Sequence, residues 1–246
     1  MRIALMSDTH LMHRRYKIRM PEAETVIHSG DATWEGKLDE LADFVEWFRN
    51  LPYKKKIFVA GNHDEIIQKN RTLARSMLGD EIIYLEDNLV EVDGLKIYGS
   101  PWQPAFGDLA FNLPRGEPLR QKWYKIPRKV DILVTHGPPL RIMDLTNDGE
   151  HVGCGDLYEA VVRRVKPRVH VFGHVHNGYG IKSEGPTLFV NAAISGMNNK
   201  PTHGVIVVDV DPLKPGEVPK AVVGPAEEPL DPIGPPILSE GTPPLW

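Results

Sequence analysis

Short apolar runs recur along the chain, and each one stops at polar or glycine-containing residues. The runs lie at positions 2–6, 25–28, 56–60, 89–98, 131–135, 169–172, 187–190 and 205–210. Their length and β-branched content predict strands, and their nearly continuous apolarity predicts burial on both faces of a sheet. The run at 89–98 contains the pair Asp93-Gly94, which predicts a hairpin turn.

Helical periodicity lies between several of these runs. The clearest helix covers residues 37–50, where acidic side chains oppose an apolar face made of Leu38, Leu41, Phe44, Val45 and Phe48. Residues 65–78 and 156–165 also predict helices, and Pro167 ends the second of them. Because strands alternate with helices, we predict one domain of the α/β class over residues 1–210.

The composition changes after position 210. Ten of the 22 prolines fall within residues 211–246, which is typical of a flexible or extended tail. Apolar residues nevertheless recur in this segment, among them Val222, Ile233 and Trp246. We therefore predict that the Pro-rich tail docks on the body of the domain or on a neighbouring subunit of a homo-oligomer.

Charge and cysteine content narrow the class of protein. The 246 residues include one Cys and ten His and carry a formal net charge of −4. A single Cys excludes a disulfide framework and a Cys-rich zinc module, and it favours a reducing, cytoplasmic location. The weak negative charge argues against nucleic acid as a partner without excluding it. No apolar stretch approaches the roughly 18 residues that a membrane span requires.

Five polar clusters follow five of the predicted strands. They are Asp8-Thr9-His10, Gly30-Asp31, Gly61-Asn62-His63-Asp64, Thr135-His136-Gly137 and Gly173-His174-Val175-His176. In α/β folds the carboxyl ends of the strands are where ligands bind. Carboxylate, imidazole and amide groups together suit divalent cations of intermediate hardness. One carboxylate can bridge two ions about 3.5–4 Å apart, and Asp31 is the natural bridge, so the clusters predict a two-metal hydrolase.

Taken together, the clusters form a specific signature. D-x-H, G-D, G-N-H-[DE], an isolated His and G-H-x-H occur in this order between Asp8 and His176. The chain therefore resembles the calcineurin-like metallophosphoesterases. Further segments at 98–102, 111–116, 136–139 and 169–173 resemble the metallophosphoesterase-domain-containing, brain-enriched branch of class III phosphodiesterases. The resemblance implies a four-layer α/β/β/α sandwich of two mixed sheets, and it leaves the Pro-rich tail unmatched.

The resemblance also implies a role for each signature residue. The first metal ion would be held by Asp8, His10, Asp31 and His176, and the second by Asp31, Asn62, His136 and His174. His63 would be the catalytic histidine, oriented by Asp64. Some animal members of the branch replace the first His of G-H-x-H with Gly, whereas this chain keeps His174, so its second site should be complete. Mn²⁺ is the expected metal, although Fe, Zn, Ni and Mg also suit such ligands.

The activity that the resemblance implies is hydrolysis of a small-molecule phosphoester. Two metal ions would activate water for in-line attack on phosphorus, and a protonated His63 would donate to the departing oxygen. The branch favours phosphodiesters such as cyclic nucleotides. The alternatives are a general phosphatase or nuclease with the same metals, or a nucleotide-binding or scaffold protein with residual activity. The intact His63 and His174 argue against the last alternative.

Other residues give weaker indications of function. His13 and Arg14 begin a basic loop after the first cluster, and Arg115 is a further candidate phosphate contact, although solvated charges would give the same pattern. Trp102 and Phe106 offer a stacking platform or simply pack a loop. We expect the remaining histidines to have structural roles, with His28 and His170 packed in the core and His151 and His203 in surface loops. We also expect Cys154 to be a packing residue.

Overall fold

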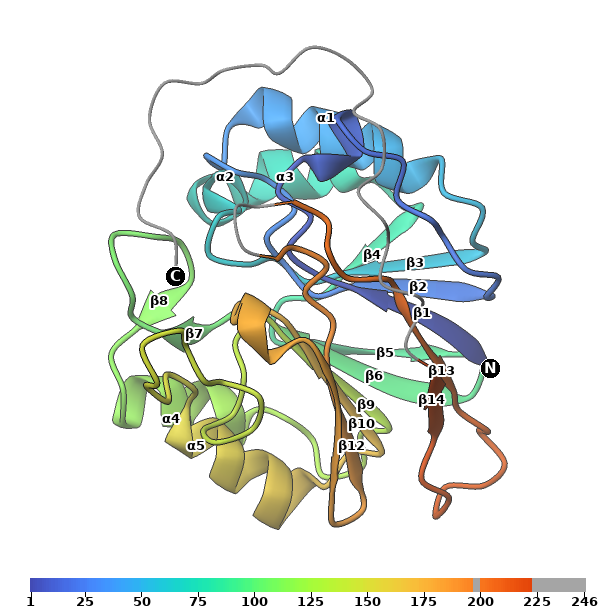
Figure 1. Cartoon of the computed structure of the whole chain (residues 1–246), viewed down its shortest axis with the longest axis vertical. Helices are drawn as coiled ribbons and strands as arrows, with labels where there is room; N and C mark the ends of the chain where they lie inside the picture. Colours follow the sequence, from blue (N-terminus) through green and yellow to red (C-terminus); the bar gives the residue numbers. More distant parts are fainter. Residues whose placement is uncertain (197–199, 223–246) are drawn as a thin grey trace.

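Two six-stranded sheets lie face to face in the computed structural model, which describes residues 1–196 and 200–222 (Figure 1). The first sheet has the order β14 (Lys220–Val222), β13 (Ile206–Asp209), β1 (Arg2–Met6), β2 (Thr25–His28), β3 (Lys55–Phe58), β4 (Ile82–Tyr84). The second has the order β11 (Gly180–Glu184), β12 (Thr187–Asn191), β10 (Val169–Phe172), β9 (Ile132–Thr135), β6 (Leu95–Ser100), β5 (Asn88–Val92). A short pair, β7 (Gln103–Pro104) and β8 (Asn112–Leu113), lies apart from both.

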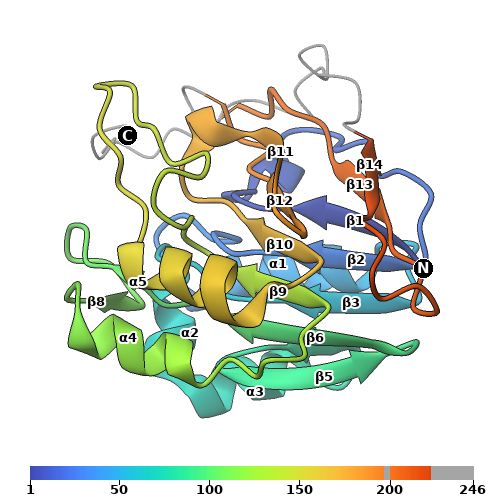
Figure 2. The ribbon, with the colours of Figure 1, turned by 90° about the horizontal axis from the view of Figure 1, so that it is seen from below.

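Helices cover the outer face of each sheet. The first sheet carries α1 (Leu38–Arg49), α2 (Glu65–Lys69) and α3 (Arg71–Leu78), and the second carries α4 (Glu117–Tyr124), α5 (Gly155–Tyr158) and the π-helix η2 (Glu159–Val165). Figure 2 shows α4 and α5 in front of the strands of the second sheet. Two 3₁₀ turns, η1 (Met12–Arg14) and η3 (His176–Gly178), follow β1 and β10. The predicted α/β/β/α sandwich of two mixed sheets is confirmed.

Parallel pairing brings the strand ends together. In the first sheet β1, β2, β3 and β4 run parallel, and in the second β12, β10, β9 and β6 do so, while antiparallel strands lie toward the edges. Parallel neighbours end at the same edge of a sheet. The loops after β1, β2, β3, β9 and β10 therefore begin close to one another.

Alternating side chains divide the core into layers. On β1 and β2, Leu5 and Ile27 point into the space between the sheets, where they join Val134 and Val171 of the second sheet. The intervening residues face the helices, as Phe58 does beside α1. Burial on both faces explains why these strands read as nearly continuous apolar runs.

Several elements depart from the sequence prediction. The helix predicted at 65–78 is two helices, because the Asn70 side chain accepts the Leu73 N–H at 3.2 Å and caps α3. The helix predicted at 156–165 continues from α5 as a π-helix. The strands β4, β7, β8, β11 and β14 and the helix α4 were not predicted. The strands β4, β7 and β8 have only two or three residues each, β11 and β14 carry polar, partly exposed residues, and α4 is a short helix.

The first sheet continues past residue 210, where the sequence predicted the start of the Pro-rich tail. β14 pairs with β13, so the first sheet includes residues up to Val222. The docking prediction concerns residues 211–246, of which 223–246 lie outside the described residues. In the described part of the chain, no helix has the length and apolarity needed to cross a bilayer.

The outer layer over the first sheet depends on Phe44. Its ring is fully buried and lies 5.0 Å from that of Phe58 and 5.2 Å from that of Phe48, between ring centroids. Replacing it with Ala leaves a cavity, so Phe44→Ala should lower the free energy of unfolding by about 3–5 kcal/mol. On the same helix Leu38 is 45% exposed, and Leu38→Ala should cost about 0.5 kcal/mol or less. Urea denaturation of both variants measures the difference, and equal losses would contradict this layer assignment.

Candidate metal centre

Within the described part of the chain, the polar strand ends converge on three overlapping groups of candidate ligand side chains. In each group the candidate ligand atoms lie within 4.8 Å of one another. The groups are Asp8, His10 and His176; His10, Asp31 and His63; and Asp31, His136 and His174. Carboxylates mixed with imidazoles form a donor set that divalent transition metals accept. These groups contain every predicted metal ligand except Asn62, whose Oδ1 lies 2.9 Å from Nε2 of His136, and they also include His63, which was predicted as the catalytic histidine.

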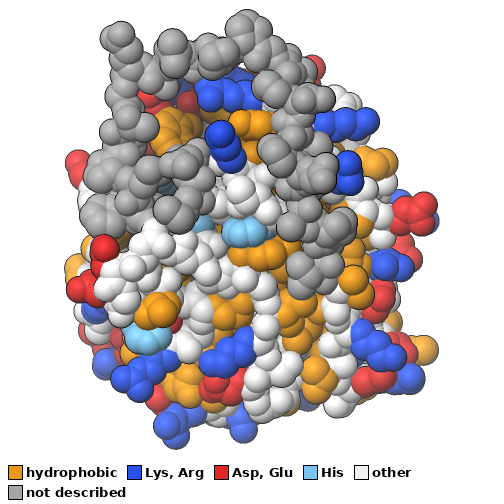
Figure 3. Space-filling view, viewed as in Figure 1, with side chains coloured by type: hydrophobic (Ala, Val, Ile, Leu, Met, Phe, Trp, Pro, Cys, Tyr) orange, Lys and Arg blue, Asp and Glu red, His pale blue; other side chains and the backbone are white. Residues whose placement is uncertain are grey.

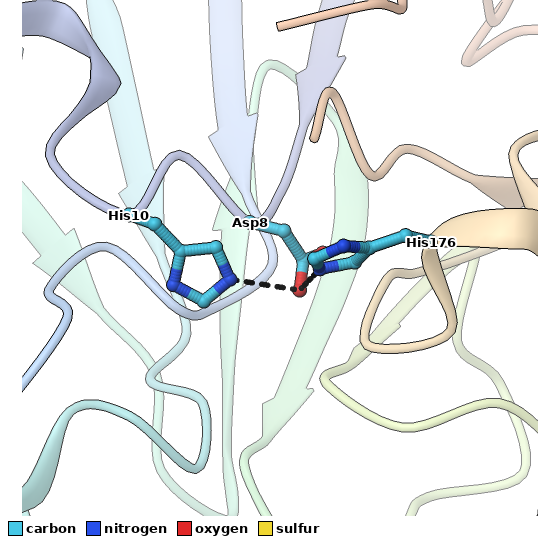
Figure 4. A group of neighbouring side chains, drawn as sticks. All are labelled: Asp8, His10 and His176. Atoms are coloured by element: carbon cyan, nitrogen blue, oxygen red, sulfur yellow. Dashed lines mark ion pairs between the residues drawn. The ribbon is translucent and has the colours of Figure 1, made fainter. Parts of the chain in front are cut away.

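The first group contains Asp8, His10 and His176. Both imidazole rings turn toward the Asp8 carboxylate, as Figure 4 shows. Nε2 of His176 lies 3.3 Å from Asp8 Oδ1, and Nε2 of His10 lies 4.0 Å from the same oxygen. His10 follows β1 and His176 follows β10, so this group joins the two sheets.

The group made of Asp31, His136 and His174 lies on the other side of the Asp31 carboxylate. Nε2 of His136 lies 3.3 Å from Asp31 Oδ2 and 2.9 Å from Oδ1 of Asn62. The His174 ring is 5.1 Å from the His136 ring, between centroids. Because Asp31 Oδ2 is also 3.8 Å from His10 Nε2, this carboxylate contacts both groups, as a bridging ligand must.

Backbone carbonyls orient three of the imidazoles. Nδ1 of His10 lies 3.2 Å from Thr33 O, Nδ1 of His136 lies 2.9 Å from Ser29 O, and Nδ1 of His63 lies 2.7 Å from Trp34 O. A carbonyl can only accept, so each Nδ1 carries the proton and donates it. In the neutral ring the lone pair is then on Nε2, which for His10 and His136 faces the Asp31 carboxylate and is available to a metal ion.

The backbone is strained at the ligands themselves. Asp8, His10, Asp31 and His174 all have left-handed backbone, with φ of 56°, 40°, 55° and 67°. Such conformations cost energy in residues other than Gly and persist only when the surroundings hold them. Four of the seven predicted ligands share this feature, which turns their side chains inward at the ends of their strands.

Two glycines of the signature allow the loops to approach closely. A Cβ at Gly61 would overlap the Asp31 side chain and backbone N, and a Cβ at Gly173 would overlap the Asp8 carboxylate and the Ser7 side chain. Any larger residue would therefore push a carboxylate out of the centre. These glycines are part of the signature for a steric reason.

Asp64 has a different role from the one predicted. Its buried carboxylate accepts the backbone N–H groups of Asp31 (3.0 Å), Thr33 (2.9 Å) and Gly61 (2.7 Å). The expectation that it orients the His63 ring is wrong, because His63 Nδ1 bonds to the Trp34 carbonyl. Asp64 instead fixes the loops that carry Asp31 and His63.

Trp34 belongs to the site, although no sequence motif predicted it. Its ring stacks on that of His63 at 5.4 Å and meets the His10 ring edge-on at 5.2 Å. The buried Glu40 carboxylate accepts the backbone N–H of Trp34 at 3.1 Å and so holds this loop to α1. The only sequence signal was its position three residues after Asp31.

The carboxylates of the centre favour positive partners. Burial raises the pKa of Asp8, but the hydrogen bond and charge of His176 outweigh it and bring the pKa below its usual range. Burial likewise opposes ionisation of Asp31, and the charge of His136 lowers its pKa well below the usual value. Both groups are therefore ionised at neutral pH and present negative charge to a cation.

The imidazoles differ in the direction in which their pKa values are shifted. For His136, burial lowers the pKa, but the charge of Asp31 outweighs it and raises the pKa to about 9. For His10, burial and the charge of His63 lower the pKa to about 3. For His174, burial and the charge of His136 lower the pKa to about 3. His136 thus holds a proton that a metal ion must displace.

The predicted substrate contacts have partners elsewhere in the described chain. His13 Nε2 lies 2.6 Å and Arg14 Nε lies 2.7 Å from Oδ2 of Asp43, which belongs to α1. Arg115 donates to the carbonyls of Val152 and Gly153. These contacts hold loops in place and give no support to a role in binding substrate.

The two aromatic candidates differ from each other. Trp102 is 8% exposed, donates its indole N–H to Asp87 at 3.0 Å and lies under the ammonium of Lys122, so it packs its loop. Phe106, by contrast, meets the His174 ring at 6.3 Å between centroids. Of this predicted platform, Phe106 is the part that borders the metal centre.

The other residues considered in the sequence mostly make structural contacts. His28 and His170 are fully buried, and Cys154 packs beside Trp123. His151 is exposed, as predicted for a surface loop, and contacts the buried Asp144. His203 is half-buried, because its ring stacks on that of Tyr179 at 4.2 Å.

Comparison with known proteins identifies the family of this chain. The family model described as calcineurin-like phosphoesterase matches residues 1–178, and the chain belongs to that family. The human metallophosphoesterase domain-containing protein 1 is 42% identical over 233 residues, covering 85% of this chain and 71% of that protein. A UPF0046 protein of Caenorhabditis elegans is 37% identical over 234 residues, covering 88% and 83%.

A solved structure confirms the fold independently. It has a TM-score of 0.65 and 15% identity, and the match covers 90% of this chain and 98% of that one. Membership of the family, together with the ligand groups, makes this protein a metal-dependent phosphoesterase.

The raised pKa of His136 predicts how metal binding depends on pH. Below about pH 9 this imidazole is protonated in the metal-free protein, and a metal ion must displace the proton. The apparent affinity for Mn²⁺ should therefore rise about tenfold per pH unit between pH 6 and 8, with release of at least one proton. Isothermal titration calorimetry in buffers of different ionisation enthalpy measures both quantities. An affinity independent of pH over this range would contradict the assignment.

Proposed function

We propose that this protein hydrolyses small phosphodiesters, such as cyclic nucleotides, with the help of two Mn²⁺ ions. The observation that carries the proposal is the Asp31 carboxylate, which contacts both groups of ligands while His63 lies beside it. Two ions bound there would supply an activated water and stabilise the charge of the phosphoryl group. The buried single Cys agrees with a reducing, cytoplasmic location.

His63 is placed to act as the general acid. Its backbone N–H donates to Asp31 Oδ1 at 2.8 Å, and its ring is held by the Trp34 carbonyl and the Trp34 indole face. With Nδ1 committed to that carbonyl, Nε2 is the atom that can carry a proton to the departing oxygen. The same contacts exclude water from one face of the ring.

The surroundings of the centre favour a diester over a monoester. A phosphate monoester carries more negative charge and would gain from nearby cations, but Arg14 and Arg115 have their partners elsewhere. Aromatic side chains flank the centre instead, with Trp34 beside His63 and Phe106 beside His174. These faces suit the organic groups of a diester.

One ligand of the centre is partly exposed to solvent. The His176 side chain is 15% exposed. In Figure 3, some histidine side chains are visible at the molecular surface. A small ligand can therefore reach the ligand groups without a rearrangement of the sheets.

A substrate panel tests the proposal. With Mn²⁺ supplied, the protein should hydrolyse bis-p-nitrophenyl phosphate and cyclic nucleotides faster than p-nitrophenyl phosphate or single-stranded DNA. His63→Asn should reduce kcat on a cyclic nucleotide by about 10²–10⁴-fold, and by less on bis-p-nitrophenyl phosphate, whose good leaving group needs little protonation. His151→Asn serves as the matched control, because His151 lies outside the ligand groups, and it should keep full activity.

The panel also separates the alternatives. Preference for p-nitrophenyl phosphate would indicate a general phosphatase, and preference for DNA a nuclease. A complete lack of turnover with bound Mn²⁺ would indicate a nucleotide-binding or scaffold protein. Equal losses on both diesters in His63→Asn would overturn the role of His63 as general acid.

A further inference from the structure

Two buried histidines have similar surroundings in the two sheets. His28 is at the end of β2 and His170 lies within β10, and both are fully buried on the helix-facing side of their sheet. Each ring is surrounded by the edges of aromatic rings, from Phe44, Phe48 and Phe58 around His28 and from Phe172 and Phe189 around His170. Such a cage would accommodate an apolar ring equally well. Packing alone therefore does not explain an imidazole at either position.

The hydrogen bonds of His28 fix its tautomer. The backbone N–H of Gly30 donates to Nδ1 at 3.2 Å, so Nδ1 carries no proton in the neutral ring. Nε2 then carries the proton, and it lies 2.9 Å from Oγ1 of Thr9. Thr9 separates Asp8 from His10, and Gly30 precedes Asp31. One imidazole thus connects two loops that carry three metal ligands.

His170 makes the corresponding contact in the second sheet. The Thr135 hydroxyl donates to Gly137 O at 2.8 Å, so its oxygen must accept from Nε2 of His170, 2.9 Å away. Thr135 directly precedes His136 on the neighbouring strand β9. Again a buried N–H fixes the threonine next to a metal ligand.

The other nitrogen of His170 shows that this contact has an energetic cost. Nδ1 is buried and has no hydrogen-bond partner in the described part of the chain. A buried acceptor without a partner destabilises the fold, and a phenyl ring in its place would remove that penalty. The Nε2–H, which an apolar ring would lack, is therefore the group that distinguishes the imidazole at this position.

We propose that His28 and His170 are positioning residues of the metal centre, each acting through the threonine that adjoins a ligand. Groups that orient metal ligands typically affect metal affinity about 10–100-fold. The inference rests on the metal centre proposed above, and it concerns affinity for the metal rather than turnover.

Metal affinity and stability together test the inference. His170→Phe should weaken binding of Mn²⁺ to the metal-free protein by about 10–100-fold, measured by calorimetry, while the urea midpoint stays the same or rises. His170→Gln places an amide N–H near the position of Nε2 and should restore most of the affinity. Phe189→Leu is the matched control, because it alters the same aromatic cage without touching Thr135, and it should lower stability without changing affinity. His28→Phe should weaken binding of Mn²⁺ in the same way, but it should also lower the urea midpoint, because it leaves the buried Gly30 N–H without its acceptor.

A double-mutant cycle checks that the effect passes through the threonine. Thr135→Val removes the hydroxyl at nearly constant volume, and combining it with His170→Phe should weaken Mn²⁺ binding no further than Thr135→Val alone. This variant also provides the test if His170→Phe does not fold. Wild-type affinity in His170→Phe, failure of His170→Gln to restore it, or additive losses in the cycle would each overturn the inference. A wild-type protein that binds no Mn²⁺ would overturn the metal centre itself, and the inference with it.

Discussion

The carboxylate of Asp31 lies between ligands that come from different sheets. Its Oδ2 is 3.8 Å from Nε2 of His10, which follows a strand of the first sheet, and 3.3 Å from Nε2 of His136, which follows a strand of the second. A buried carboxylate is costly unless it is neutralised and hydrogen-bonded. Here the His136 imidazole and the His63 backbone N–H offset that cost. The relative position of the two sheets therefore determines whether the site exists.

The rest of the structure keeps this arrangement in place. Side chains such as Ile27 and Val134 pack between the sheets and set their spacing. The Asp64 carboxylate holds the loop of Asp31 by its backbone N–H groups, and backbone carbonyls orient His10, His63 and His136. Strained backbone at the ligands is tolerated because so many contacts fix it from outside. These contacts position the ligand side chains without the help of a bound substrate.

Much of the fold and the site could be predicted because burial leaves a strong pattern. Strands buried on both faces are continuous apolar runs, and the polar residues that interrupt them at one edge must share a site. Edge strand β11 and the short helix α4 lack such a pattern. The contacts of Trp34, the role of Asp64 and the bonds of His28 and His170 depend on tertiary geometry that no spacing encodes. The apolar run around a histidine predicts that its side chain is buried, but the run does not indicate which groups the ring nitrogens contact.

Electron paramagnetic resonance of the Mn²⁺-loaded protein tests the central claim most directly. Two ions bridged by Asp31, about 3.5–4 Å apart, should give a spin-coupled signal at a stoichiometry of two per chain. Replacing the bridge in Asp31→Ala should abolish the coupling, even where an ion remains bound. A single ion per chain, or two ions that give uncoupled signals in the wild-type protein, would contradict the account.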